Sequence, residues 1–308
     1  MTPNNTQTTD TLLLVRPSRF RKNEETAINN YFQEDIVGKD IAAAATREFD
    51  NFVQVLTDFG LNTLVLQDDG HLNTPDSIFP NNTISFHKRT AVIYPMFAEN
   101  RRRERQLQPI QALANWGINY EDIVDYSDHE KQDIFLEGTG CLILDRINRI
   151  AYCSLSARAH PTLIHQFCLD LGYAPFIFQA NQSVGRLRKP IYHTNVMMAV
   201  GTHFAQICLQ SIDNMMEREA IKQRLADSGK TIIEISEQQM NNFAGNILEV
   251  RSTSGTTGIV MSSQAYRSLS ALQVNQLESL GTIVHAPLDT IETAGGGSAR
   301  CMIAEVFY

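Results

Sequence analysis

The chain has 308 residues, of which 43% are hydrophobic and 19% are charged, a composition typical of a globular protein with a substantial core. The net charge of −8 at pH 7 argues against nucleic acid or an anionic membrane surface as the main partner. Residues 1–10 are polar and no apolar run reaches membrane-spanning length, so we expect a cytoplasmic protein without a signal or a span. The cysteines are odd in number and lack CxxC spacing, so we expect reduced thiols at Cys141, Cys153, Cys168, Cys208 and Cys301.

Apolar strand-like runs and amphipathic helical stretches follow one another in a recurring order. The first half predicts, in chain order, a strand at 12–15, a helix at 36–59, a strand at 62–66, a hairpin of 84–86 and 90–94, a helix at 99–116, strands at 140–144 and 150–153, a helix at 161–171 and a strand at 174–178. The basic run at 101–105 belongs to the second of these helices and is interpreted as its solvated face.

The second half repeats the same order of elements. It predicts strands at 196–200 and 204–209, a helix at 213–227, a strand at 231–235, strands at 247–251 and 258–261, a helix at 264–280 and a strand at 282–285. A strand–strand–helix–strand unit therefore recurs about five times, with a period of roughly 60 residues and a glycine after each helix. The sequence shows no linker rich in Pro, Gly or Ser, so we expect a single domain over 1–308. Five such units closed in a ring would leave a central cavity, and loops from every unit would converge at its opening.

The last residues of the chain carry a candidate nucleophile. Three glycines at 295–297 permit tight turns or close approach, and the apolar run 301–307 is typical of a buried strand. Cys301 therefore lies where a flexible loop meets a rigid strand, a position that gives a thiol both access and placement. The alternative is a structural thiol, because free cysteine is among the most buried residue types.

Two further loops carry residue types that would complete nucleophilic chemistry. Glu137 lies between an apolar run and a glycine turn, and His193 comes just before a strand. A thiol, an imidazole and a carboxylate can act as nucleophile, proton shuttle and orienting group. Each also has a structural interpretation, since Glu137 could cap a backbone turn and His193 could be a core histidine bonded to a carbonyl.

The whole chain resembles the amidinotransferase superfamily of guanidine-modifying enzymes, which includes arginine deiminase, dimethylargininase, glycine amidinotransferase and succinylarginine dihydrolase. The resemblance rests on the five-unit pattern and on the order of a Glu-Gly loop, a His before a strand and a Cys after a Gly-rich loop. Shorter segments favour the branch of citrulline-utilisation hydrolases: Arg16-Pro17, Asn23-Glu24-Glu25-Thr26, Asn30-Tyr31-Phe32-Gln33, Ile78-Phe79-Pro80-Asn81-Asn82 and Tyr94-Pro95-Met96. The resemblance implies a five-bladed α/β propeller of ββαβ units, with Cys301 as nucleophile, His193 as general acid/base, Glu137 as its carboxylate partner, and no metal or organic cofactor.

The departures from the family pattern bear on the substrate. Arginine-processing members typically have aspartates where this chain has Asn82, Gly140 and Asn195. Carboxylates bind a guanidinium through charge-assisted hydrogen bonds, whereas an amide can both donate and accept and so suits a neutral ureido group. Asp76 remains as a candidate contact to a substrate amine, although a loop aspartate in a turn is an equally good interpretation.

These observations favour a hydrolase that cleaves a C–N bond of a linear ureido or guanidino compound, with citrulline converted to ornithine, carbon dioxide and ammonia. In this interpretation Cys301 forms a covalent intermediate, and backbone N–H groups of the loop 295–297 stabilise the oxyanion. The alternatives within the class are arginine deiminase or dihydrolase activity and amidino transfer. Outside the class, the alternative is a non-catalytic propeller that binds a protein or an amino acid. The expected partner is a small amino acid, citrulline or arginine-like, and a homodimer is an open option.

Overall fold

Five three-stranded sheets and one separate hairpin contain the strands of the protein, in a computed structural model that describes residues 6–36 and 40–308. The three-stranded sheets are β17 (Ala304–Glu305), β1 (Thr11–Arg16) and β2 (Asn62–Gln67); β3 (Ile84–His87), β4 (Thr90–Ile93) and β5 (Asp122–Asp125); β6 (Ile143–Asp145), β7 (Ile150–Ser154) and β8 (Ala174–Phe178); β11 (Met198–Val200), β12 (Phe204–Ile207) and β13 (Thr231–Glu234); and β14 (Leu248–Arg251), β15 (Thr257–Ser262) and β16 (Thr282–Ala286). The hairpin is β9 (Asn181–Val184) with β10 (Leu187–Pro190).

All five three-stranded sheets have the same pairing. The middle strand pairs antiparallel with the strand written first above and parallel with the third. A parallel pair requires a long crossover, and the predicted helices supply it. In the sheet that joins the two chain ends, Leu12 is opposite Glu305 and Leu13 is opposite Ala304, so the C-terminal strand completes a sheet that the N-terminal strand begins.

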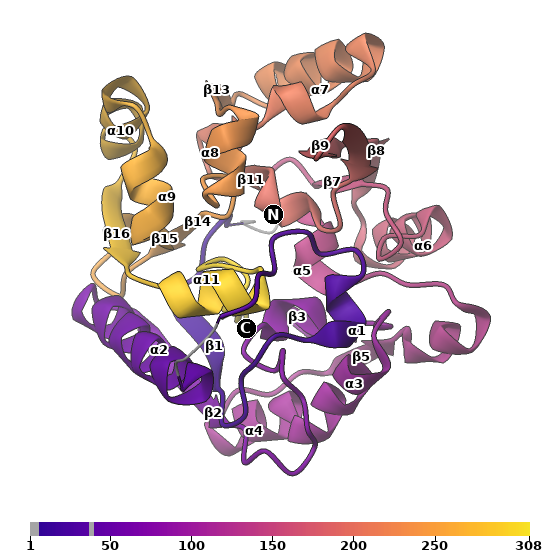
Figure 1. Ribbon diagram of the computed structural model, residues 1–308, viewed down its shortest axis with the longest axis vertical. Coiled ribbons are helices and arrows are strands. Elements are labelled where there is room, and N and C mark those ends of the chain that lie inside the picture. The colour runs from indigo at the N-terminus through magenta and orange to yellow at the C-terminus, as the bar shows by residue number, and fades with distance from the viewer. Residues whose placement is uncertain (1–5, 37–39) are drawn as a thin grey trace.

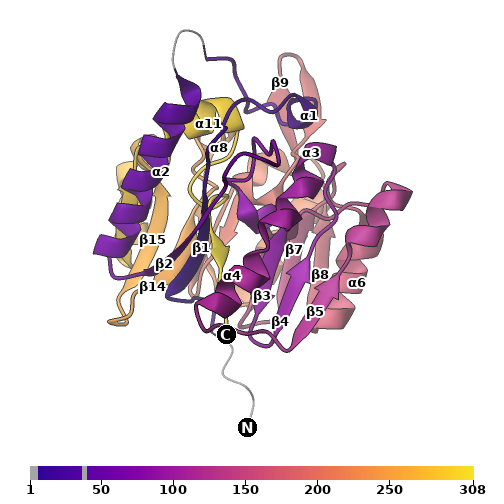
Figure 2. The same ribbon diagram turned by 90° about the horizontal axis from the view of Figure 1, so that it is seen from below.

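The crossover helices lie on the outside of the molecule and the sheets surround its middle (Figure 1). The helix α2 (Ile41–Asp58) buries Ala45, Phe49, Phe52 and Leu56, which recur at helical spacing and pack in one core cluster with Leu12 and Leu14 of β1. Burial of this apolar stripe, rather than helix propensity, holds the helix on its sheet. Figure 2 shows α1 (Glu24–Ala27) and α11 (Asp289–Gly295) together at one end of the molecule and the C-terminus at the other.

The expected mixed α/β class and most of the expected elements are confirmed. The helix α6 (Pro161–Leu171) has the predicted bounds, and α7 (Met215–Asp227) begins two residues later than predicted. Asp40 caps α2, and residues 37–39 of the predicted helix lie outside the described residues. Of the five glycines expected after helices, four have a positive φ, namely Gly60, Gly117, Gly172 and Gly229.

Two predicted helices are interrupted, which corrects the sequence analysis. The predicted helix 99–116 consists of α3 (Glu99–Arg102), a 3₁₀ segment Arg103–Leu107 and α4 (Pro109–Asn115), because Gln108 has a φ of 52° and precedes a proline. The predicted helix 264–280 consists of α9 (Ser263–Ser268) and α10 (Ala271–Glu278). Leu269 is extended there, and Ser270 starts the second helix with a capping box.

Several short elements were not predicted. They are the strand β5, the hairpin β9–β10, and the helices α1, α5 (Gly138–Cys141), α8 (Glu237–Asn241) and α11. The expectation of a strand from Cys301 onward is wrong, because Cys301 lies in a turn and only Ala304–Glu305 pair as a strand. Gly140, expected in a strand, lies in the helical turn α5. Within residues 6–36 and 40–308, none of the helices has the length and apolar character needed to cross a bilayer.

Candidate active site

Each of the five sheets has a polar residue in the turn that leads into its first strand. In each sheet this first strand is the one that pairs antiparallel with the middle strand. The five turns are therefore equivalent positions of the repeated unit. The residues in chain order are Asn82 before β3, Glu137 before β6, His193 and Asn195 before β11, Asn246 before β14, and Cys301 before β17. The contacts below show that these turns meet.

The thiol of Cys301 is held between two amides. The side-chain nitrogen Nδ2 of Asn246 donates to Sγ at 3.1 Å, and Nδ2 of Asn195 donates to Sγ at 3.4 Å. The oxygen of Asn246 accepts the backbone N–H of Arg300 at 3.0 Å, which fixes the amide with its NH2 toward the sulfur. Asn246 was missed from the sequence. Its place before β14, matching Asn82 before β3, is the signal that could have found it.

The resting thiol is protonated. Burial raises the pKa of Cys301 above its ordinary value, against the lowering effects of the Ser298 backbone, of Asn246 and Asn195, and of Arg300. The amide donors therefore stabilise a thiolate that burial alone would disfavour. The amides thus offset part of the cost of a buried negative sulfur, while the pKa of the thiol stays raised.

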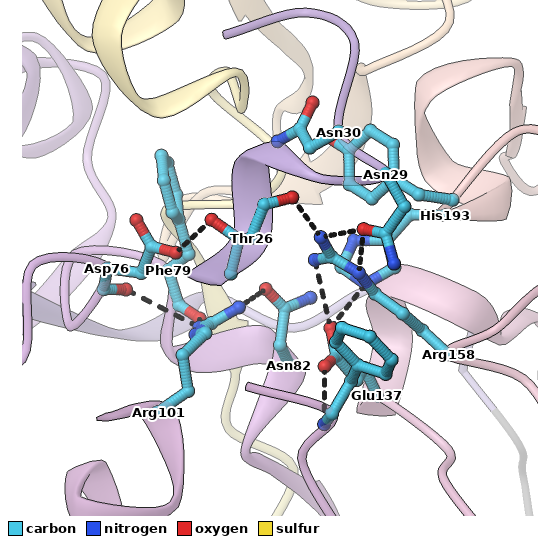
Figure 3. A network of polar contacts seen from close by, with 12 residues as sticks. Thr26, Asn29, Asn30, Asp76, Phe79, Asn82, Arg101, Glu137, Arg158 and His193 are labelled. Carbon is cyan, nitrogen blue, oxygen red and sulfur yellow. Dashed lines mark hydrogen bonds and ion pairs between the residues drawn. The ribbon is translucent and has the colours of Figure 1, made fainter. Parts of the chain in front are cut away.

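Glu137 and His193 form a hydrogen-bonded pair, completed by an arginine that the sequence analysis did not single out. Nε2 of His193 lies 2.7 Å from Oε2 of Glu137, and Nη1 of Arg158 lies 3.3 Å from the same oxygen. The other oxygen of Glu137 accepts the backbone N–H of Phe97 at 3.0 Å. All three side chains are buried, and Figure 3 shows them grouped on one side of the site.

The protonation states follow from this geometry. Burial would raise the pKa of Glu137, but Arg158 and the His193 hydrogen bond hold it well below its ordinary value. Burial lowers the pKa of His193 to about 4, despite the raising effect of Glu137, so the imidazole is neutral at pH 7. Because an ionised carboxylate only accepts, Nε2 carries the hydrogen and Nδ1 keeps a lone pair for a proton.

The amide of Asn82 is oriented by a buried guanidinium. Nη1 of Arg101 donates to Oδ1 of Asn82 at 2.8 Å, while Nδ2 of Asn82 has no hydrogen-bond partner (Figure 3). Arg101 also pairs with Glu104, at 2.8 Å, and is almost fully buried. The expectation that the basic run forms a solvated helix face is therefore wrong for Arg101, whose side chain is buried against Asn82 and Glu104.

The two asparagines in place of family aspartates offer complementary groups. Arginine only donates, so the atom of Asn82 bonded to Arg101 is its oxygen and the free group is an NH2 donor. Asn195 donates to the thiol, and its Oδ1 is buried without a partner. The pair thus presents one free donor and one free acceptor, the set that a ureido C=O and NH2 can satisfy.

Gly140 leaves room for these groups. A Cβ at this position would lie 2.2 Å from Nδ2 of Asn82 and 2.8 Å from Nδ1 of His193. Any larger residue would have to displace both side chains. The glycine therefore lets the Asn82 amide and the His193 ring approach each other, and the space of a family aspartate is already filled.

Asp76 and a segment near the N-terminus cover the same region. Oδ2 of Asp76 accepts from Asn23 at 2.8 Å and from Thr26 at 3.1 Å, whereas Oδ1 is buried without a partner. Arg158 donates to the backbone oxygen of Thr26 at 3.0 Å (Figure 3). This bond connects the covering segment, residues 23–33, to the arginine that pairs with Glu137. Burial raises the pKa of Asp76.

All six residues predicted for the site are at most 3% exposed: Asp76, Asn82, Glu137, His193, Asn195 and Cys301. Sγ of Cys301 is therefore accessible from outside only after neighbouring groups move, and the covering segment, residues 23–33, contacts this region. Among the described residues, no group of three or more His, Cys, Asp or Glu side chains is placed to hold a metal ion.

The glycine loop differs from expectation at Gly296. Its N–H donates to the backbone oxygen of Glu292 at 2.9 Å and is therefore not available to an oxyanion. Its carbonyl accepts from Tyr192 at 2.5 Å and from Asn30 at 3.3 Å. This part of the loop thus presents carbonyls to its surroundings, and Asn246 and Asn195 supply the donors near the sulfur.

A family model matches nearly the whole chain. The model of the family described as N,N dimethylarginine dimethylhydrolase, eukaryotic, matches residues 16–308. No curated protein matches the sequence.

Solved structures share the fold over nearly the whole chain. The N-terminal domain of ArgZ, an arginine dihydrolase from the ornithine-ammonia cycle in cyanobacteria, is 16% identical with a TM-score of 0.75, and the match covers 96% of this chain and 98% of that one. AgrE with ornithine and NAD+ is 18% identical with a TM-score of 0.75, covering 96% of this chain but 39% of AgrE. DDAH from Pseudomonas aeruginosa, complexed with citrulline, is 16% identical with a TM-score of 0.65, covering 97% and 99%. These are pentein-fold enzymes.

Proposed function

This chain belongs to the N,N-dimethylarginine dimethylhydrolase family and is a hydrolase of C–N bonds, and we propose that its substrate is citrulline, cleaved to ornithine, carbon dioxide and ammonia. The five three-stranded sheets act as the blades of a single-domain, five-bladed propeller, with the site at the turns before their first strands. The observation that carries the substrate proposal is the pair of free groups on Asn82 and Asn195.

The charge of the site supports a neutral substrate. The free NH2 of Asn82 can donate to the ureido oxygen, and the free Oδ1 of Asn195 can accept from the ureido NH2. A guanidinium has only donors, so it would leave the Asn82 NH2 unpaired and would face Arg101 close behind it. A buried unpaired donor costs about 1–3 kcal/mol, which favours citrulline over arginine by about tenfold or more. Asp76, with its free Oδ1, supplies an acceptor for the ammonium group of the substrate.

The chemistry uses Cys301, His193 and Glu137. Nδ1 of neutral His193 takes the proton of the thiol as Sγ attacks the ureido carbon, and Glu137 stabilises the imidazolium that forms. The imidazolium then protonates the leaving nitrogen, which releases ornithine and leaves a carbamoyl group on Sγ. His193 next deprotonates water, which displaces the thiolate. Carbamic acid departs and breaks down to carbon dioxide and ammonia.

Arginine is the second candidate substrate. The observation that favours it is the fold shared with ArgZ, described as an arginine dihydrolase, and with DDAH. Dihydrolysis would release two molecules of ammonia for each ornithine, against one from citrulline.

The proposal is tested by measuring kcat/KM for citrulline and for arginine and by counting ammonia released per ornithine. We expect kcat/KM for citrulline to exceed that for arginine by about tenfold or more. We also expect one ammonia to be released for each ornithine. In acid-quenched mixtures, mass spectrometry should find a carbamoyl adduct on the peptide with Cys301 and none in Cys301→Ser. A preference for arginine with two ammonia per ornithine would establish the second candidate instead, and turnover by neither substrate would favour a binding module.

A further inference from the structure

A cavity that α11 lines through Glu292 and Thr293 is not used by the proposed reaction. Its volume is about 360 Å³, within the range of small-molecule sites. Its walls come from the unpredicted hairpin β9–β10 through Gln182, from residues 31–34, from Phe243, and from α11 through Glu292. The hairpin is a separate two-stranded sheet outside the five three-stranded ones, and it forms one wall of this cavity.

Two buried polar atoms of residues that line this cavity have no hydrogen-bond partner. They are Oε2 of Glu292 and Nε2 of Gln182, whose side chains are almost fully buried. Buried polar groups are nearly always paired, so an unpaired acceptor and an unpaired donor on one cavity call for a ligand or solvent there. Burial raises the pKa of Glu292 to about 7, against the lowering effect of Ser262 and Ser298. A cation beside it would favour the ionised form.

The charge and shape of the lining select the class of ligand. Glu34 and Glu292 both line the cavity, and its described lining contains no Lys, Arg or His side chain. The aromatic rings of Tyr31, Phe32 and Phe243 form the apolar part of the lining. The ring centroids of Phe32 and Phe243 are 5.3 Å apart. Acidic and aromatic groups together attract an ammonium group.

We propose that this cavity is a second, non-catalytic binding site for a small amino acid, with the ammonium on Oε2 of Glu292 and the carboxylate on Nε2 of Gln182. Both ligand groups then meet the unpaired atom of matching type. A ligand with an amine alone would satisfy Glu292 but not Gln182, and an anion alone would be repelled by the two carboxylates.

The site is connected to the nucleophile by a short chain of hydrogen bonds. The other oxygen of Glu292 accepts from Oγ of Ser298 at 2.5 Å, and the backbone oxygen of Ser298 accepts from the N–H of Cys301 at 2.9 Å. A ligand that draws Glu292 toward the cavity therefore acts on the turn that holds Sγ. This coupling rests on the proposed function, whereas binding itself does not.

The test is calorimetry on the full chain carrying Cys301→Ala, saturated with citrulline and titrated with L-ornithine. We expect a saturable binding event that Glu292→Gln weakens by about tenfold or more, because a charge-assisted bond is lost while volume and the Ser298 contact are kept. Gln182→Leu should weaken it too, and 1,4-diaminobutane, which lacks a carboxylate, should bind more weakly than ornithine. Glu278→Gln removes the same charge from an exposed position and should leave binding unchanged. Thermal melting of each variant verifies that it is folded.

Three outcomes would overturn the site: no binding of ornithine, ornithine binding that only competes with citrulline, or equal binding by the Glu292→Gln variant. If citrulline gives no heat but ornithine binding still depends on Glu292 and Gln182, the proposed substrate fails while the second site stands. The readouts thus separate the two proposals.

Discussion

The polar groups of the candidate site fall into two regions that differ in charge. The charged cluster, Glu137, His193 and Arg158, contains an ionised carboxylate, a neutral imidazole and a guanidinium joined by direct contacts. The amide cluster, Asn82, Asn195 and Asn246, has no charge of its own. All six side chains are buried.

The two clusters leave different atoms free, and the proposed reaction gives them different tasks. In the charged cluster, both oxygens of Glu137 are engaged, which fixes the tautomer of His193 and leaves Nδ1 for the proton. In the amide cluster, one atom of Asn82 and one of Asn195 remain unpaired. In the proposed reaction, proton transfer would use the firmly held charge of Glu137, and recognition of a neutral group would use the unpaired donor and acceptor of the amides.

Removing the charge of Glu137 should have the largest effect. Glu137→Gln keeps the size of the side chain but cannot stabilise an imidazolium, so we expect kcat to fall by about 10²–10³-fold with a smaller change in KM. Steady-state kinetics with citrulline measures both.

Glu130→Gln is the matched control for this change. Glu130 likewise accepts a backbone N–H, from Met96, and pairs with a guanidinium, that of Arg105, but lies outside the site. We expect its kcat to stay within about threefold. An equal loss in both variants would mean that Glu137 acts only through structure.

The charged cluster should also make stability depend on pH. The folded pKa of His193 is lowered from 6.5 to about 4, so between these values the unfolded chain binds a proton that the folded chain does not. Stability is therefore lost as pH falls through this window, by at most about 3 kcal/mol. Urea unfolding at several pH values measures the loss, and His193→Asn should flatten the curve. An unchanged slope in that variant would assign the loss to other groups.

The smallest effect is expected in the amide cluster. In Asn82→Asp one oxygen can still accept from Arg101, so the turn keeps its shape, and the other replaces a donor with an acceptor. We expect the ratio of kcat/KM for citrulline over arginine to fall by about tenfold, with Arg101 limiting the gain for arginine. Asn51→Asp adds the same charge on the exposed face of α2 and should leave the ratio as in the wild type. If the site variant matches this control, the amide serves the turn and not the substrate.

The sequence alone predicted the elements whose signal is local. Alternation of apolar residues and helix-ending glycines located the strands and the long helices α2, α6 and α7, because burial of one face imposes a period on the chain. It also indicated Cys301, His193 and Glu137, since loops between such elements carry reactive residue types. Breaks such as Gln108 and Leu269 were missed, because a single residue in a different backbone region leaves little trace in a periodic pattern.

Only the tertiary structure decided how the site residues are paired and oriented. Arg101 and Arg158 lie in what resembles ordinary surface sequence, yet one orients Asn82 and the other holds Glu137 ionised and binds the covering segment. Asn246 contacts a cysteine 55 residues away. Sequence spacing does not encode such contacts, because they form only when the turns before β3, β6, β11, β14 and β17 meet. The orientation of each amide then follows from its neighbours' ability to donate or accept, a property of the assembled site.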